Sequence, residues 1–415
     1  MAFIRMRFVF RFFLAIILLI GAISTFMMLR VHHWSRKSYV DRPTITSQSL
    51  RLLSEDIRKF NEDIAWPSGD KPTLRNQTDD HRVSLTQPAS ELDPTTNPER
   101  RRSLVIFGDD RSGTTLLTRM FSEDPNMFSV YEPLWITRNW KRQDRDRNNS
   151  KDVTDVVNAL MSCRFVGNPT AMKFLAETSQ KWAPGLFKNP FQSPPICNET
   201  DITKGTCPSP ETIPKVVEDA CSRYYKHSVT KLAIVRVPDR KLSNIFPQII
   251  YADNPDTDIK ILHVVRDPRG SINSRINLGW LKDVDKAKNF PAWPRDTCEG
   301  IIQNVKFGAR LEGGLKQNYM LVQYKDIASS PVTTAMKIYK FAGFEMPESL
   351  ISWIIQATNP SKETLEKEAN KRFSSFRNST ANVEKWRQES PIERVRIIEE
   401  ECSELLDLLH LERLT

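Results

Sequence analysis

The stretch Ser103 to Leu117, SLVIFGDDRSGTTLL, constrains the fold of this chain more than any other. Apolar residues at 104–107 predict a buried strand, a polar turn ends at Gly113, and apolar residues with helical spacing follow. A strand, a tight turn and a helix N-terminus form an anion site, because backbone N–H groups and the helix dipole point at the bound oxygens. The nucleotide-binding version, GxxxxGK[ST], has a Lys where Gly113 stands. The sequence therefore predicts a P-loop-like anion site without the usual Lys.

Short apolar runs recur after residue 103 and predict an α/β domain. The runs are LVIF at 104–107, FSVY at 128–131, LAIVRV at 232–237, ILHVV at 261–265 and YMLVQY at 319–324. Continuous apolarity suits strands that are covered on both faces, and helical patterns lie between the runs. We expect a five-stranded, mainly parallel sheet flanked by helices. The Pro-, Asn- and Cys-rich segment at about 138–225 is too long for one crossover and predicts an insertion with short helices.

The N-terminal region has a different character. Residues 12–29, FFLAIILLIGAISTFMML, carry no charge and are long enough to span a bilayer. A cleaved signal peptide is the alternative, but bulky residues follow the small residues of this segment and favour an anchor. Basic residues flank both ends, so the positive-inside rule does not orient the segment. We expect a cytosolic tail at 1–11, a signal anchor at 12–29, a largely disordered stem at 30–102 and a folded domain at 103–415.

All six cysteines and four N-x-[ST] sequons lie downstream of the predicted anchor. The sequons are at Asn76, Asn148, Asn198 and Asn378. An even cysteine count together with sequons suits an oxidising lumen. Six cysteines permit fifteen pairings, and the short spacing of Cys197 and Cys207 in a Pro-rich segment predicts a local bridge. Cys163 with Cys221, and Cys298 with Cys402, would then remain, with buried free thiols as the alternative.

The net charge does not indicate a nucleic-acid partner. The formal charge is +9, but residues 1–102 hold 16 Lys and Arg against 11 Asp and Glu, which leaves +4 for the remaining 313 residues. The folded domain is therefore nearly balanced, and it has no long basic run. No CxxC motif or His/Cys cluster indicates a metal site.

Polar residues follow three of the predicted strands. They are Asp109 to Thr115, Glu132, and Arg266 to Arg269. The carboxyl ends of strands hold the ligand crevice of an open α/β sheet, so we expect these segments to converge. Arg266 and Ser274 have the spacing to hold a second phosphate between a guanidinium and a hydroxyl. Two separate anion sites fit 3'-phosphoadenosine-5'-phosphosulfate (PAPS), which carries phosphates at two ends of its ribose.

With these motifs, the chain resembles the Golgi carbohydrate sulfotransferases, and most closely the branch that sulfates the 6-hydroxyl of galactose, N-acetylglucosamine or N-acetylgalactosamine. The resemblance covers about 103–411. It rests on DRSGTTLL, VYEPLW at 130–135, VVRDPRGSINSR at 264–275, LVQYKDI at 321–327 and RNSTANVEKWR at 377–387 before Cys402. The family usually has Ser-Ser at Thr114-Thr115, and the hydroxyls are kept here.

The resemblance implies PAPS as the sulfate donor, no metal, and a glycan acceptor such as a keratan sulfate, chondroitin, N- or O-glycan chain. It also implies a single-pass type II protein of the Golgi membrane with a lumenal catalytic domain. No nucleic-acid partner is expected, and the oligomeric state stays open, a homo-oligomer included.

Carried over residue by residue, the resemblance implies which side chains bind the donor. The loop around Arg111 would hold the 5'-phosphosulfate, Arg266 with Ser274 the 3'-phosphate, and a late segment at 386–387 would add contacts. Arg111 would also stabilise charge on the bridging oxygen as sulfur leaves. The expected donor-binding residues are Asp110, Arg111, Ser112, Gly113, Thr114, Thr115, Leu116, Arg266, Asp267, Pro268, Arg269, Ser274, Trp386 and Arg387.

The acceptor is a neutral alcohol and needs a base to take its proton. Glu132 is the candidate general base, because it lies at the end of the strand next to the donor loop. Glu132 and Arg111 are the two expected catalytic residues. The alternative for Glu132 is a structural carboxylate in a cap or salt bridge. His263 is the rival base, but its position inside ILHVV favours a core residue.

Three other functions stay open at this stage: sulfation of another acceptor such as protein tyrosine, an inactive PAPS-binding protein that binds glycans, and a nucleotide kinase. Intact Arg111, Glu132, Arg266 and Ser274 disfavour the inactive protein. The missing Lys, and the lack of a strand that ends in a metal-binding Asp, disfavour a Mg²⁺-dependent kinase. The sequence does not name the sugar.

Overall fold

The computed structural model describes residues 100–139, 149–181, 187–252, 256–281, 290–368, 371 and 374–414. The predicted tail and anchor and nearly all of the predicted stem lie outside these ranges, as do the sequons at Asn76 and Asn148. Within the described ranges, no helix combines the length and the apolar character that crossing a membrane requires. The first strand begins at Arg101, two residues before the predicted start of the domain.

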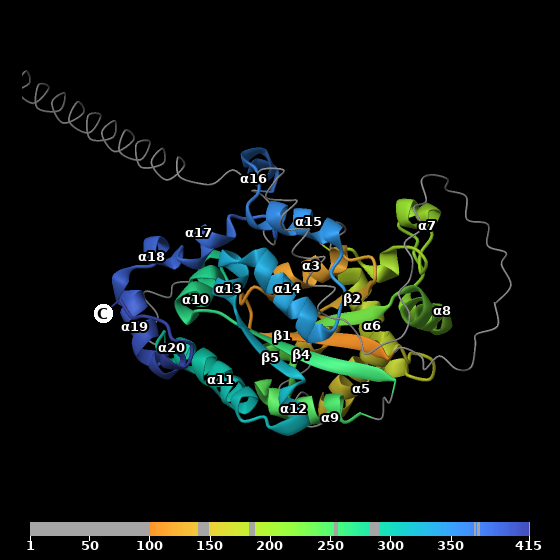
Figure 1. The fold of residues 1–415 in the computed structure, drawn as a ribbon, viewed down its shortest axis with the longest axis horizontal. Coiled ribbons are helices and arrows are strands. Elements are labelled where there is room, and N and C mark those ends of the chain that lie inside the picture. Colours follow the sequence, from red (N-terminus) through yellow and green to blue (C-terminus); the bar gives the residue numbers. More distant parts are fainter. Residues whose placement is uncertain are drawn as a thin grey trace, which may run out of the picture. The chain divides into compact units, whose positions relative to one another are not determined.

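Helices lie between successive strands of the described chain and follow the last strand (Figure 1). The strands are β1 (Arg101–Gly108), β2 (Met127–Tyr131), β3 (His227–Ala233), β4 (Thr257–Val265) and β5 (Tyr319–Gln323). The α-helices are α3 (Thr114–Glu123), α5 (Asn149–Ser162), α6 (Pro169–Lys181), α7 (Glu199–Lys204), α8 (Pro214–Asp219), α9 (Phe246–Ile250), α10 (Pro268–Asn277), α11 (Ala292–Ala309), α12 (Gly313–Lys316), α13 (Tyr324–Ser329), α14 (Pro331–Ala342), α15 (Glu348–Thr358), α16 (Lys362–Glu368), α17 (Ser379–Val383), α18 (Trp386–Glu389), α19 (Ile392–Glu401) and α20 (Ser403–Leu408). Short 3₁₀ segments are η1 (Pro133–Asn139), η2 (Pro190–Gln192), η3 (Pro210–Thr212), η5 (Ile234–Arg236), η6 (Pro238–Arg240) and η7 (Leu242–Asn244), and η4 (Ala220–Tyr224) is a π turn.

The sheet has five strands in the order β2-β3-β1-β4-β5, and all four neighbouring pairs are parallel. This confirms the predicted five-stranded, mainly parallel sheet. From β1 the chain crosses to β2 on one side, and from β3 it crosses to β4 on the other, so the winding direction reverses beside β1. In a doubly wound sheet, the crevice outside the carboxyl ends at such a reversal is the usual ligand site. The fold thus places the loop after β1 at that crevice.

The third strand was predicted at 232–237, and this prediction was wrong in its boundaries. The strand runs over 227–233, and Ile234–Arg236 form a 3₁₀ turn instead. The polar residues of HSVTKLA hid the strand, although all seven are buried. Burial of Thr230 and Ser228 is tolerated because each has a partner: the Thr230 hydroxyl donates to the Val130 carbonyl at 3.0 Å, and the Arg101 guanidinium donates to Ser228 Oγ at 2.8 Å.

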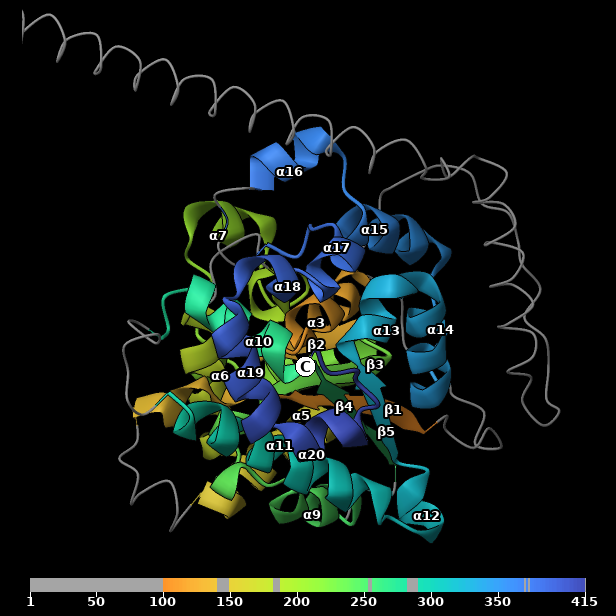
Figure 2. The same cartoon turned by 90° about the vertical axis from the view of Figure 1, so that its left-hand side faces the viewer.

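Helices cover both faces of the sheet. Figures 1 and 2 show α3 on one face and α5 with α9 on the other. In α5 the fully buried Val153, Val156, Val157 and Leu160 recur at helical spacing and join the main hydrophobic cluster of the sheet. The segment predicted as an insertion therefore does contain helices, and its first helix belongs to the core of the domain.

Three disulfide bonds connect the described cysteines. They join Cys163 to Cys221, Cys197 to Cys207, and Cys298 to Cys402, with Cα–Cα distances of 5.5, 5.4 and 5.5 Å. These are the predicted local bridge and the two remaining pairs, and no cysteine in the described chain is left as a thiol. The third bridge ties α11 to the end of α19, so it fixes the C-terminal helices to the domain.

Two buried histidines make stability depend on pH. Burial lowers the pKa of His263 and of His227 to about 3, and the charges of Arg101, Arg102 and Lys226 act in the same direction on His227. In the unfolded chain both should titrate near pH 6.5. Below that pH the unfolded state binds more protons than the folded state, so the free energy of unfolding falls as pH drops toward 3.

We therefore expect each histidine to cost about 1 kcal/mol of stability between pH 7 and pH 5.5. The His227→Phe variant should keep the ring stacking on Phe344 (centroids 4.6 Å apart) and remove a buried Nδ1 that has no partner among the described residues. It should be at least as stable as wild type at pH 7 and lose about half of this pH dependence. Urea unfolding at both pH values measures this, and an unchanged pH slope would contradict it.

Candidate active site

The loop between β1 and α3 is held in one conformation by a glycine and a tyrosine. Gly113 has φ +98°, and a Cβ at this position would lie 2.4 Å from Cδ2 of Tyr324. Only glycine fits this contact without a shift. The Ser112 hydroxyl donates to the Asp109 carbonyl at 2.7 Å and closes the turn. The N-cap of α3, Gly113, offers no side chain to cap the helix, so the N-terminus of α3 lacks the usual side-chain cap.

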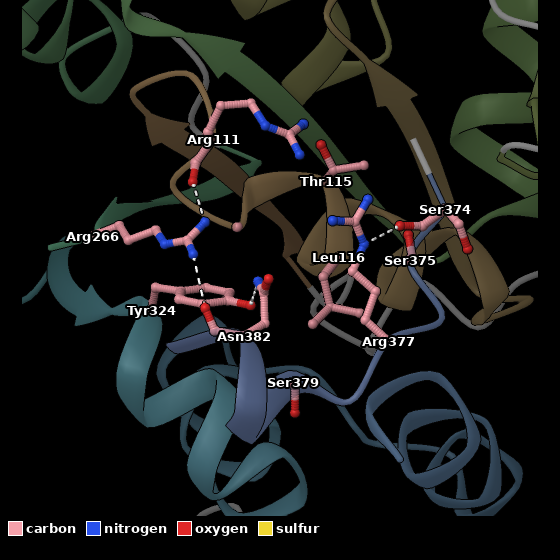
Figure 3. Close-up of a pocket in the computed structure, with 11 residues that line it drawn as sticks. Arg111, Thr115, Leu116, Arg266, Tyr324, Ser374, Ser375, Arg377, Ser379 and Asn382 are labelled. Atoms are coloured by element: carbon pink, nitrogen blue, oxygen red, sulfur yellow. Dashed lines mark hydrogen bonds between the residues drawn. The ribbon is translucent and has the colours of Figure 1, made fainter. Parts of the chain in front are cut away.

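A cleft with a free volume of about 540 Å³, open solvent included, lies beside this loop (Figure 3). We call it the donor cleft. It is lined by Arg111, Gly113, Thr115, Leu116, Arg266, Tyr324, Ser374, Ser375, Arg377, Ser379 and Asn382. Three of these side chains are guanidiniums, and none of the described lining residues is a carboxylate. The predicted convergence of the loop after β1 with the segment after β4 is therefore observed.

The three guanidiniums lie close enough to affect one another. Burial, with the charges of Arg377 and Arg266 acting in the same direction, lowers the pKa of Arg111 to about 10. Burial also lowers the pKa of Arg266. Like charges that are brought together without a carboxylate repel one another, and a bound polyanion would remove that repulsion. The electrostatics of the donor cleft therefore favour an anion with more than one charged group.

Hydrogen bonds fix Arg266 and Arg111 in place. Arg266 donates to the Arg111 carbonyl and to the Asn382 carbonyl, both at 3.1 Å, and its guanidinium lies 4.3 Å from the ring centroid of Tyr324. Arg111 Nε donates to Ser274 Oγ at 3.1 Å. Ser274 is thus held against Arg111, and this contact joins the two anion sites that the sequence predicted separately.

Glu132 lies at the end of β2 with its backbone in the left-handed region (φ +47°), where non-glycine residues are strained. The residue is 5% exposed, and its carboxylate contacts Lys231 Nζ and accepts from Arg236 Nε at 3.3 Å. Burial raises the pKa of Glu132, but Lys231 and Arg236 outweigh burial and hold it below its usual value. The carboxylate is therefore ionised at neutral pH. Burial raises the pKa of Asp110 in the phosphate loop, while the charge of Lys231 lowers this pKa and that of Glu132 raises it, so both groups lie near the loop.

His263 does not take part in this arrangement. It is 1% exposed in the middle of β4, its Nδ1 shares a 2.8 Å hydrogen bond with the Tyr319 hydroxyl, and its ring meets Phe107 edge-on. With a pKa lowered to about 3 it stays neutral. The interpretation of His263 as a core residue is confirmed.

Most of the chain matches a known protein family. The sulfotransferase domain family matches residues 101–410. The chain belongs to this family. This membership confirms the prediction of a PAPS-dependent sulfotransferase.

Several relatives of this sulfotransferase are carbohydrate sulfotransferases. Carbohydrate sulfotransferase 3 of Mus musculus is 23% identical over 415 residues, which cover 91% of this chain and 82% of the mouse protein. Carbohydrate sulfotransferase 1 of Danio rerio is 24% identical, covering 75% and 78%. A solved sulfotransferase domain from the curacin biosynthetic pathway is 14% identical and covers 76% of this chain and 99% of that chain, with a TM-score of 0.40. The sheet order and register above, rather than this distant likeness, define the fold.

Some predicted donor-binding residues do not line the donor cleft. Arg269 is 2% exposed, pairs with Asp267 and Glu399, and lies 4.3 Å from the ring centroid of the buried Trp386. Arg387 pairs with Glu384 at the surface. Arg269 thus connects α10 to α18 and α19, and the predicted contribution of Asp267, Arg269, Trp386 and Arg387 to donor binding stays a prediction.

Other lining residues received no role from the sequence. They are Tyr324, Ser374, Ser375, Arg377, Ser379 and Asn382. Most of them lie in LVQYKDI and RNSTANVEKWR, two of the stretches that carry the family resemblance, so the signal was present. The sequence did not show the long-range contacts that bring these segments to the cleft: Arg266 donates to the Asn382 carbonyl, and α13 packs on α17.

Proposed function

We propose that this sulfotransferase transfers sulfate from PAPS to the 6-hydroxyl of a hexose or N-acetylhexosamine in a glycan of the keratan sulfate or chondroitin kind. The observation that supports it most is the donor cleft, in which three guanidiniums meet a helix N-terminus without a carboxylate among the described lining residues. The relatives named carbohydrate sulfotransferases support the sugar acceptor.

The residues of the donor cleft fit PAPS. The α3 N-terminus and Arg111 would hold the 5'-phosphosulfate, and Arg266 with Ser274 would hold the 3'-phosphate, with Arg377 as a further guanidinium of the cleft that can pair with it. Ser375 Oγ is buried and has no partner among the described residues, as expected of a group that a ligand would satisfy. PAPS supplies the sulfuryl group. None of the described residues forms a cluster that could hold a metal ion.

In this proposal Glu132 accepts the proton of the sugar hydroxyl while the oxygen bonds to sulfur, and Arg111 stabilises charge on the oxygen that leaves. Glu132 is ionised, as a base must be, and it neighbours the phosphate loop through Asp110. The alternative, a structural carboxylate that only compensates Lys231 and Arg236, rests on the same ion pairs. The turnover and the nucleotide affinity of a Glu132→Gln variant separate the two.

We also place this enzyme in the Golgi membrane as a type II protein, with 12–29 as the anchor and 30–102 as the stem. Three disulfide bonds in the domain agree with an oxidising lumen. Of the sequons in the described chain, Asn198 is exposed, and Asn378 accepts from the Ala381 N–H at the start of α17.

The proposed activity is tested by incubating the full chain with labelled PAPS and polymers of galactose, N-acetylglucosamine or N-acetylgalactosamine. Transfer to at least one polymer in the presence of a chelator is expected. Transfer only to a tyrosine peptide would favour the alternative acceptor. Mg²⁺-dependent phosphoryl transfer from ATP would reject the proposal in favour of a kinase.

Loss of Arg266 should weaken donor binding specifically. Arg266→Ala and Ser274→Ala are each expected to reduce affinity for the desulfated product nucleotide roughly ten- to a hundredfold. Arg266→Ala removes a charged hydrogen-bond donor, and Ser274→Ala removes a hydroxyl that also holds Arg111 in place. Calorimetry measures this. Arg396→Ala, which removes a surface guanidinium paired with Glu393, is the matched control and should bind normally. Normal nucleotide affinity in both test variants would reject the assigned 3'-phosphate site.

A further inference from the structure

A second cleft borders the phosphate loop, with a free volume of about 700 Å³, open solvent included. It shares no lining residue with the donor cleft. It is lined by Asp109, Asp110, Ile234, Val235, Arg240, Arg275, Trp280, Trp293, Asp296, Thr297 and Gly300. We propose that this cleft binds an uncharged pyranose unit of the acceptor, with Trp280 and Trp293 as its aromatic walls. This inference rests on the proposed function and specifies which kind of sugar it acts on.

The cleft lies where an acceptor must lie, next to the loop that holds the transferred group. Asp109 and Asp110 precede Arg111 in that loop, and Arg275 reaches them from α10, contacting the Asp109 carboxylate and donating to the Asp110 carbonyl at 2.8 Å. The Trp280 ring centroid is 6.0 Å from the Arg111 guanidinium. A sugar against Trp280 would therefore sit beside the residue that faces the donor.

The two tryptophans are placed by the backbone. Helix α10 ends in a turn through Gly279 (φ +69°), in which the Trp280 N–H donates to the Arg275 carbonyl at 3.1 Å. Trp293 lies in the first turn of α11, with its ring centroid 5.5 Å from the Arg275 guanidinium. Trp280 is 45% exposed. A large aromatic face left open in a cleft with polar groups at its edge is typical of a small-ligand site, and a pyranose ring has an apolar face to pack on it.

The charge of the cleft selects against an anionic sugar. Three carboxylates and two guanidiniums line it, and Asp109 and Arg275 compensate each other. This leaves Asp296 and Asp110, whose pKa burial raises, against Arg240, in contrast to the donor cleft, whose charged lining residues are all cationic. Carboxylates accept hydrogen bonds from sugar hydroxyls but repel a uronate. The cleft therefore favours chains of neutral hexose and N-acetylhexosamine over chains that alternate with uronic acid.

Calorimetry on the full chain with product nucleotide bound tests this. The probes are a neutral hexasaccharide of alternating galactose and N-acetylglucosamine and a hexasaccharide of alternating glucuronate and N-acetylgalactosamine. We expect the neutral probe to bind more tightly, and Trp280→Ala to weaken it at least tenfold while nucleotide affinity changes less than twofold. Tyr251→Ala, which removes an aromatic ring 69% exposed elsewhere, is the matched control and should change neither.

Asp296→Asn preserves the shape of the cleft and covers the case in which Trp280→Ala misfolds. It should weaken the neutral probe severalfold and bring the affinities of the two probes closer together. Unchanged binding of the neutral probe in correctly folded Trp280→Ala and Asp296→Asn, or preference of wild type for the glucuronate probe, would overturn the inference. Sulfate transfer by wild type tests the proposed function separately. If sulfate is transferred but transfer does not depend on Trp280, only the proposed sugar site in this cleft is rejected. If the neutral probe binds through Trp280 but no glycan is sulfated, only the proposed activity is rejected.

Discussion

Glu132→Gln is expected to lower turnover by roughly 10² to 10⁴ while leaving affinity for the desulfated product nucleotide nearly unchanged. The change keeps the size of the side chain but removes the group that accepts the proton. Nucleotide affinity should hold because Glu132 does not line the donor cleft. Wild-type turnover should fall as pH drops through the pKa of Glu132, because protonation removes the base, and the variant should lack this acid limb.

The same substitution also leaves Lys231 buried beside a neutral amide, so some loss of melting temperature is expected whatever the role of Glu132. Arg236→Gln is the matched control, because it breaks the other ion pair of Glu132 and keeps the carboxylate. It should destabilise the fold but retain turnover within about tenfold. The lost cation should raise the pKa of Glu132, so the acid limb should move to higher pH.

Two results would remove Glu132 from the mechanism. One is a folded Glu132→Gln variant with more than about a tenth of wild-type turnover. The other is a parallel loss of turnover in Glu132→Gln and Arg236→Gln that follows melting temperature alone. Either would make Glu132 a structural carboxylate, and the search for the base would turn to Asp110, which lies in the same loop as Arg111.

The parts of the fold that sequence reasoning predicted correctly depend on local signals. Apolar runs marked β1, β2, β4 and β5, and Gly113 marked the turn, because each is governed by neighbours a few residues away. The third strand was displaced because Ser228, Thr230 and Lys231 count as polar in any local pattern. Their burial depends on partners far along the chain: Lys231 contacts Glu132 across 99 positions, and Arg101 donates to Ser228 Oγ across 127.

The residues of the candidate site also differ in whether local sequence signals or long-range contacts determine their positions. Arg111, Arg266 and Ser274 could be predicted because each stands at a strand end or in the following helix, where topology alone brings them to one edge of the sheet. Arg377 could not, because its position depends on how the segment after α16 runs back to the cleft. Trp280 could not either, because only the assembled fold places its ring near Arg111.

Arg111→Ala should have an effect as large as that of Glu132→Gln, but with a different signature. Arg111 is expected both to attract the donor and to stabilise the leaving oxygen, so its removal should lower kcat/KM by at least about 10³, with losses in both turnover and nucleotide affinity. Glu132→Gln should affect turnover alone. Single-turnover rates and nucleotide calorimetry on the two variants separate these patterns.

Arg111→Lys is the informative companion, since it restores a cation in the loop but not the fork that donates to Ser274 at 3.1 Å. If charge on the leaving oxygen is what the transition state requires, the Lys variant should recover turnover to within about tenfold of wild type. Nucleotide affinity should stay reduced, because Ser274 no longer orients the side chain. Equal failure of the Lys and Ala variants would mean that geometry, not charge, is the contribution of this position. A folded Ala variant that keeps a tenth of wild-type turnover would assign the stabilisation of the leaving group to Arg377 or to the N–H groups of α3 instead.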